Sequence, residues 1–93
     1  MKHYEGMFIF KPDLNKDSLD KLLSQAKELV EKNKGSIDQV KEWGKQRLAY
    51  PIEKYKEGIY YLVDFHIIPE AITDIRRAFS LNESILRVLI VNI

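Results

Sequence analysis

The hydrophobic positions of this chain follow two different periods. Over residues 16–34 they recur every three or four residues, which predicts an amphipathic helix with one buried face. Residues 69–81 repeat the same period over a shorter stretch. Asn15 suits the N-cap of the first helix and Gly35 its C-terminal cap, while Pro69 suits the first turn of the second helix.

Strands are predicted in four other stretches. Residues 4–10 are rich in aromatic and aliphatic side chains and stop at Lys11-Pro12-Asp13. Residues 59–67 alternate between two faces, and residues 85–93 form a last apolar stretch. The strand at residues 37–48 needs a bulge, because its apolar positions do not keep to one face. The stretch between this strand and Gly58 is predicted as a loop, since the residue before a proline is extended.

The resulting order is β-α-β-β-α-β within a single domain covering residues 1–93. This order is that of the ferredoxin-like α+β fold, in which two helices pack on one face of a four-stranded antiparallel sheet. The other face of the sheet is left open. The residues predicted to fill the core between helices and sheet are Phe8, Leu22, Leu23, Ala26, Val30, Val63, Phe65, Ile72, Ile75, Phe79, Val88 and Ile90.

The composition excludes several classes of protein. A hydrophobic content of 45% and a formal charge of +1 are those of an ordinary globular domain. The absence of cysteine excludes disulfides and thiolate chemistry. No apolar run is long enough to cross a bilayer, and no nucleophile motif or phosphate-binding glycine loop is present. We therefore expect neither an enzyme nor a membrane protein, with no cofactor and no small-molecule substrate.

Polar residues on the open face raise the question of a metal site. In this fold the first and third strands are antiparallel neighbours, and pairing His3 with His66 places Glu5 opposite Asp64. Two imidazoles and two carboxylates are a possible ligand set. Solvated polar residues at strand ends are the simpler interpretation, and no metal is expected.

The apolar part of the same face predicts a surface for a protein partner. Its members come from three strands and are Met7, Ile9, Tyr60, Leu62, Leu89 and Val91. A contiguous exposed apolar patch marks an interaction site. The alternative is that some of these residues are ordinary isolated surface hydrophobes.

Basic and aromatic residues are concentrated between Lys41 and Gly58. This stretch carries Lys41, Lys45, Arg47, Lys54 and Lys56 with tyrosines interleaved. Cations of this kind neutralise phosphates, and aromatic rings stack on exposed bases. The pattern favours contact with RNA, although solvated loops often carry a similar charge.

The string Arg47-Leu48-Ala49-Tyr50-Pro51-Ile52-x-Lys54, with Gly58 after it and Tyr4-Glu5 near the start, resembles the bacterial small-subunit ribosomal protein six family. The resemblance covers essentially the whole chain. It implies a ferredoxin-like, non-enzymatic component of the small ribosomal subunit in the cytoplasm. It also implies binding to small-subunit ribosomal RNA together with ribosomal protein eighteen of that subunit.

Carried over onto this sequence, the family string makes Arg47, Tyr50 and Lys54 the leading RNA contacts, with Lys2 and Arg87 as further candidates. Tyr50 has a second interpretation, in which its ring packs under its own loop. A nearly neutral chain has few phosphate contacts to offer, so a basic partner is expected to supply the rest of the RNA affinity. The competing hypothesis is a ferredoxin-like regulatory or ligand-binding domain that dimerises through its open sheet face.

Overall fold

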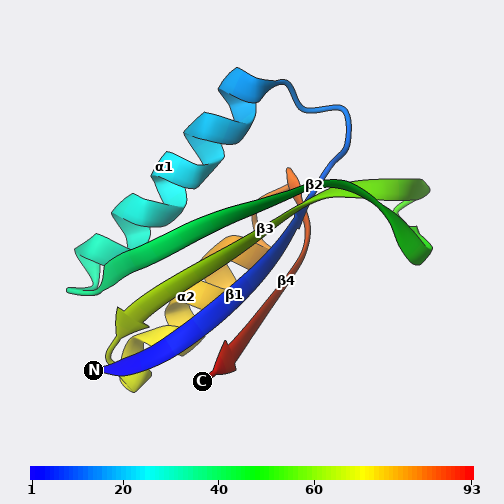
Figure 1. Ribbon diagram of the computed structural model, residues 1–93. Helices are drawn as coiled ribbons and strands as arrows, with labels where there is room; N and C mark the ends of the chain where they lie inside the picture. The colour runs from blue at the N-terminus through cyan, green and yellow to red at the C-terminus, as the bar shows by residue number, and fades with distance from the viewer.

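The computed structural model describes residues 1–93 and has the predicted order of elements. These are β1 (Lys2–Phe10), α1 (Lys16–Lys32), β2 (Ser36–Ile52), β3 (Tyr55–Ile67), a 3-10 turn (Pro69–Ala71), α2 (Ile72–Ser80) and β4 (Ile85–Asn92). The strands form one antiparallel sheet in the order β2-β3-β1-β4. Both helices lie on the same face of this sheet (Figure 1). The ferredoxin-like fold with one open face is therefore confirmed.

Helix α1 begins as the sequence predicts, with the side-chain oxygen of Asn15 accepting a hydrogen bond from the Ser18 amide at 2.8 Å. Its C-terminal end differs from the prediction. The left-handed residue is Lys34, with φ of 65°, and not Gly35. Gly35 is needed for space instead, because a Cβ there would lie 2.6 Å from the carbonyl oxygen of His66.

Replacing Lys34 by glycine is expected to raise the free energy of unfolding by about 0.5–1 kcal/mol. A left-handed conformation costs an L-residue energy that glycine avoids, and this gain exceeds the extra chain entropy of glycine. Urea denaturation monitored by circular dichroism measures the change. Lys32→Gly is the matched control, since Lys32 is helical and exposed and should lose stability by a similar amount. A loss in both variants would refute strain at Lys34.

The predicted loop before Gly58 is wrong, because β2 and β3 continue into a long hairpin. Only Glu53 and Lys54 separate the strands, and their φ angles of 48° and 75° are those of a tight two-residue hairpin turn. Pro51 is tolerated within β2 because this is an edge strand. The predicted bulge is confirmed, since the β2–β3 register shifts near Ile37 and near Glu42.

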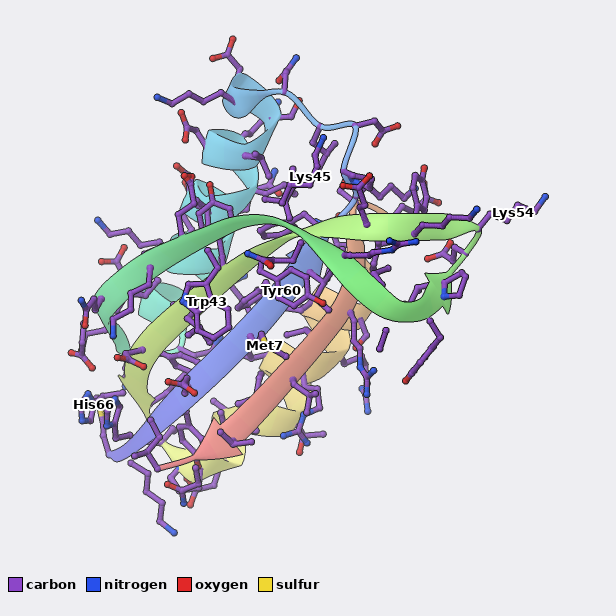
Figure 2. All side chains as sticks on the ribbon, turned by 45° about the vertical axis from the view of Figure 1, so that its right-hand side comes forward. Met7, Trp43, Lys45, Lys54, Tyr60 and His66 are labelled. Atoms are coloured by element: carbon purple, nitrogen blue, oxygen red, sulfur yellow. The ribbon has the colours of Figure 1, made fainter.

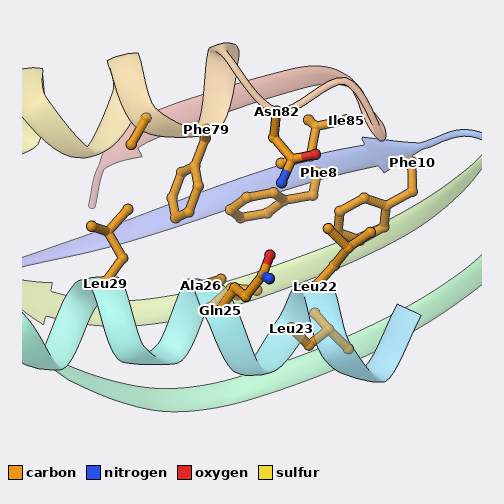
Figure 3. Close-up of a pocket in the computed structure, with 12 residues that line it drawn as sticks. Phe8, Phe10, Leu22, Leu23, Gln25, Ala26, Leu29, Phe79, Asn82 and Ile85 are labelled. Carbon is orange, nitrogen blue, oxygen red and sulfur yellow. The ribbon is translucent and has the colours of Figure 1, made fainter. Parts of the chain in front are cut away.

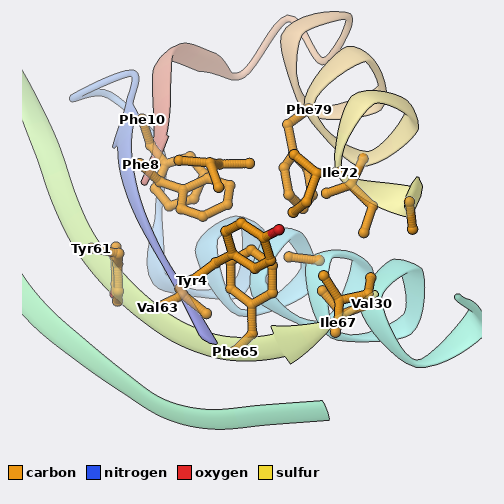
Figure 4. Packing of buried hydrophobic residues seen from close by; sticks show 14 of the residues in the cluster. Tyr4, Phe8, Phe10, Val30, Tyr61, Val63, Phe65, Ile67, Ile72 and Phe79 are labelled. Carbon is orange, nitrogen blue, oxygen red and sulfur yellow. The ribbon is translucent and has the colours of Figure 1, made fainter. Parts of the chain in front are cut away.

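The core lies between the helices and the sheet (Figure 4). Phe65 is 1% exposed and stacks on Tyr4 with ring centroids 5.8 Å apart, while Phe8 meets Phe79 edge to face. Of the predicted core residues, Leu22, Leu23 and Val88 are only partly buried, and all the others lie inside the cluster. Neither helix has the length and apolar character needed to cross a membrane.

Tyr61 belongs to this core and carries a polar hydroxyl group. The hydroxyl of Tyr61 donates to Oε2 of Glu42 on the neighbouring strand at 3.2 Å. Burial, followed by the charge of Glu42, raises the pKa of Tyr61 above its usual value. The hydroxyl therefore stays protonated at physiological pH and can donate to Glu42, the residue at which the second register shift of β2 begins.

Candidate protein and RNA interface

The register of the open face is the one that the sequence predicts. His3 lies opposite His66, Glu5 opposite Asp64 and Met7 opposite Leu62 along the β1–β3 pair. Because side chains alternate along a strand, all of these point to the face away from the helices. This face has a polar end near the start of β1 and an apolar centre.

At the polar end the two imidazoles stack, with ring centroids 4.6 Å apart and planes 10° from parallel. Nδ1 of His66 contacts a carboxylate oxygen of Asp38, and Nε2 of His3 is buried without a hydrogen-bond partner. No group of three or more histidine or acidic side chains is arranged to hold a metal ion.

The apolar centre of the open face is built around Met7. Met7 lies in the central strand β1, directly between Leu62 on β3 and Leu89 on β4. Leu89 is 40% exposed, and Val91 on the same strand is 48% exposed. The predicted residues of this group therefore lie side by side rather than as isolated surface positions.

Ile9 is a correction to the predicted partner face. It lies opposite Tyr60 as expected, but only 4% of its surface is exposed. Gly58 makes this burial possible, because a Cβ at that position would lie 2.4 Å from Cγ2 of Ile9. The buried side chain of Leu48 lies beside Gly58 and helps to cover the same place. Ile9 therefore packs under the chain's own hairpin and is not available to a partner.

Trp43 is an apolar residue of this face that sequence reasoning missed. It is the extra residue of the bulge between Glu42 and Gly44, and 52% of its surface is exposed. Figure 2 shows Trp43 near Tyr60 and Met7 on the face away from the helices. The bulge interrupts the two-residue alternation of side chains, so alternation does not assign Trp43 to a face. The only signal in the sequence is a tryptophan beside Gly44. We define the apolar sheet face as Met7, Trp43, Tyr60, Leu62, Leu89 and Val91.

The end of β2 curls across the sheet at the edge of this face. Tyr50 is 62% exposed, and its hydroxyl accepts a hydrogen bond from Nη1 of Arg87 on β4 at 3.2 Å. The interpretation in which the Tyr50 ring is buried under its own loop is therefore wrong. A hollow of about 160 Å³ remains between the hairpin and the strands. Its lining residues include Met7, Tyr60, Leu89 and both members of the Tyr50–Arg87 pair.

The other candidate RNA contacts are distributed along the hairpin and beyond it. Arg47 is exposed on β2 opposite Glu57, and Lys54 is exposed at the hairpin tip. Neither forms an ion pair, since the structure has one ion pair and it joins His66 to Asp38. Lys2 lies opposite Ile67, at the far end of the sheet from the hairpin. The structure thus brings Tyr50 and Arg87 into contact, places Arg47 and Lys54 along the same hairpin, and separates Lys2 from all of them.

An open sheet face with exposed apolar side chains, beside the end of the hairpin that carries the exposed cations Arg47 and Lys54, has the features of an interaction surface. Comparison with known proteins gives the family. The model of the family Ribosomal protein S6 matches residues 3–92. Small ribosomal subunit protein bS6 of Clostridium novyi is 36% identical, over 99% of this chain and 97% of its own length. The protein of the same name from Corynebacterium kroppenstedtii is 42% identical, over 94% of this chain and 92% of its own length.

Structural comparison agrees. The crystal structure of 30S ribosomal protein S6 from Thermotoga maritima superposes with a TM-score of 0.92 at 27% identity, covering 99% of this chain and 87% of that one. The chain belongs to the ribosomal protein S6 family. It is therefore a bacterial small-subunit ribosomal protein of the cytoplasm and not an enzyme.

Proposed function

We propose that this protein binds small-subunit ribosomal RNA together with ribosomal protein eighteen, docking that protein on the apolar sheet face. The observation that carries the proposal is the position of this face directly beside the cationic hairpin. Leu89 is exposed on β4, and Arg87, two residues earlier on the same strand, holds Tyr50 of the hairpin. A partner seated on the face would therefore present its own cations to the same stretch of RNA.

Charge supports the need for a partner. The chain has 15 basic and 14 acidic residues, so its long-range attraction for a polyanion is weak. Each phosphate contact also weakens as salt rises. The cations of the hairpin are few, and a basic partner would provide the remaining contacts.

Analytical sedimentation tests the proposal under three conditions. The purified chain is measured alone, with protein eighteen, and with protein eighteen plus a fragment of small-subunit ribosomal RNA. We expect a monomer alone, a one-to-one complex with the partner and a ternary complex with RNA. A stable dimer of the chain that binds neither protein eighteen nor the RNA would favour the competing hypothesis of a regulatory or ligand-binding domain. Binding to RNA at full affinity without the partner would contradict the role given to the partner.

Replacing Arg47 or Lys54 by alanine is expected to weaken RNA binding in the ternary assay without changing the fold. Both side chains are exposed and outside the core, so folding should be unaffected. Each variant should lower the slope of log affinity against log salt concentration by about one phosphate contact. Titration of labelled RNA at several salt concentrations, with protein eighteen present, measures both quantities.

The matched control is Lys27→Ala, which removes an exposed cation from α1 on the other side of the sheet. It changes the net charge by the same amount, so it isolates the effect of position from that of overall charge. A salt slope unchanged in both hairpin variants, or lowered equally in Lys27→Ala, would rule out direct contact between this hairpin and the RNA.

A further inference from the structure

A cavity lies on the helix side of the sheet, between α1 and α2. Its volume is about 210 Å³, and Figure 3 shows its walls formed by both helices, with β1 behind. Ten of its twelve lining residues are hydrophobic. They include the aromatic rings of Phe8, Phe10 and Phe79 and the aliphatic side chains of Leu22, Leu29 and Ile85.

Two small residues explain why the cavity is not filled. Ala26 on α1 and Ala78 on α2 both line it, so at these two positions the helix contributes only a methyl group. Protein interiors are normally packed with few voids larger than a water molecule. An apolar space of this size is poorly suited to water, which needs several polar partners.

The mouth of the cavity is polar on two sides. Figure 3 shows the carboxamides of Gln25 on α1 and Asn82 beyond α2 turned toward the space between the helices. The oxygen of Asn82 accepts a hydrogen bond from the Ser84 amide at 2.9 Å, whereas the Gln25 side chain has no partner within the protein. A ligand with one N–H or O–H group would find an acceptor at this mouth.

We propose that this cavity binds a small neutral aromatic molecule, of one or two fused rings, with its polar N–H or O–H at the Gln25 side. The volume sets the size class, since an apolar cavity of about 150 Å³ in another protein takes up benzene, while drug-sized ligands need about 300 Å³ or more. The aromatic lining supplies edge-to-face contacts for a ring. The molecule is a ligand and not a substrate, because no nucleophile or acid-base pair lines the cavity.

The site is independent of the proposed ribosomal function. None of its residues belongs to the apolar sheet face or to the candidate RNA contacts, and its one residue from the hairpin strands, Val63, lies in the core on the helix side of the sheet. A variant that loses partner or RNA binding should therefore still bind the cavity ligand. A variant that loses the cavity ligand should still bind the partner and the RNA.

Indole is the probe for the test. At indole concentrations about three times its dissociation constant, the thermal midpoint of the full chain should rise by about 4 °C, through mass action on the folded state. In methyl-resolved NMR spectra, indole should shift the signals of Leu22, Leu29 and Ile85. The signals of Leu89 and Val91 on the far face should not move.

Filling the cavity gives the decisive comparison. Ala78→Leu is expected to fold, because Ala78 is exposed at the cavity mouth, and to lose indole binding by at least about tenfold. Ala26→Leu fills the cavity from the other helix and should act in the same way. Ser24→Leu adds the same kind of side chain on the exposed face of α1 and should leave binding unchanged. No midpoint rise in the unmodified chain, or full binding in both filled variants, would overturn the proposal.

Discussion

Replacing Phe65 by alanine is expected to lower the free energy of unfolding by about 3–5 kcal/mol. Phe65 is 1% exposed and lies at the centre of the cluster between the helices and the sheet. Its ring stacks on Tyr4 and contacts the position of Gly6, so its removal leaves a cavity that the rigid central strands cannot close. Thermal and urea denaturation of the purified variant measure the loss.

The control for this prediction is Val91→Ala on the opposite face. Val91 is 48% exposed and touches the open side of the sheet, so its truncation in the free protein should cost less than about 1 kcal/mol. An unchanged unfolding midpoint for Phe65→Ala, or an equal loss in both variants, would contradict the assignment of Phe65 to the core face of the sheet and Val91 to its open face.

The faces of the elements could be predicted from the sequence because burial enforces a period. A shift of one residue in β1 or β3 would move every apolar side chain from the core to water, so the face of each residue is strongly specified. Alternation therefore placed His3 and His66 on the same face, while their pairing was a choice of register within the ferredoxin-like order that the structure matches. The helix periods were equally informative, and they placed Val30, Ile75 and Phe79 in the core.

Left-handed backbone positions could not be predicted in the same way. Gly35 carries the usual sequence signal for a helix end, yet the left-handed residue is Lys34. At the hairpin tip, Glu53 and Lys54 adopt positive φ without any glycine or asparagine. In both places tertiary contacts outweigh local preference: Gly35 is held against the His66 carbonyl, and the two strands of the hairpin fix the turn.

The candidate site could be predicted only in part from the sequence, because its shape depends on the path of the edge strand β2. The alternation of side chains along β1 correctly predicts that Ile9 lies on the open side of the sheet. It does not predict that the curled end of β2 covers Ile9 there. The contact between Tyr50 and Arg87 joins residues 37 positions apart in the sequence, and no local pattern encodes it. The position of Trp43 likewise depends on a bulge whose exact place the sequence leaves open.

Replacing Leu62 by aspartate is expected to leave the free protein folded and to weaken its binding to protein eighteen by at least about thirtyfold, equivalent to about 2 kcal/mol. Leu62 is half-buried at the centre of the apolar sheet face, between Met7 and Lys41 on the neighbouring strands. In the free protein a carboxylate there is solvated, and its strand neighbour Lys41 carries the opposite charge. Within a dry interface the same charge loses its water, and the cost appears as lost affinity.

Two further variants separate this explanation from its alternatives. Leu81→Asp makes the same substitution at a residue 76% exposed beyond α2, outside the apolar sheet face, and should bind the partner normally. Leu62→Asn removes the apolar side chain without adding charge, so its affinity should fall between those of the unmodified chain and Leu62→Asp. Isothermal titration with protein eighteen, after a circular-dichroism check of folding, gives all three affinities. Normal affinity in a folded Leu62→Asp variant would exclude the centre of this face from the partner interface, since an interface that covered Met7 and Leu89 could not leave the residue beside them in water.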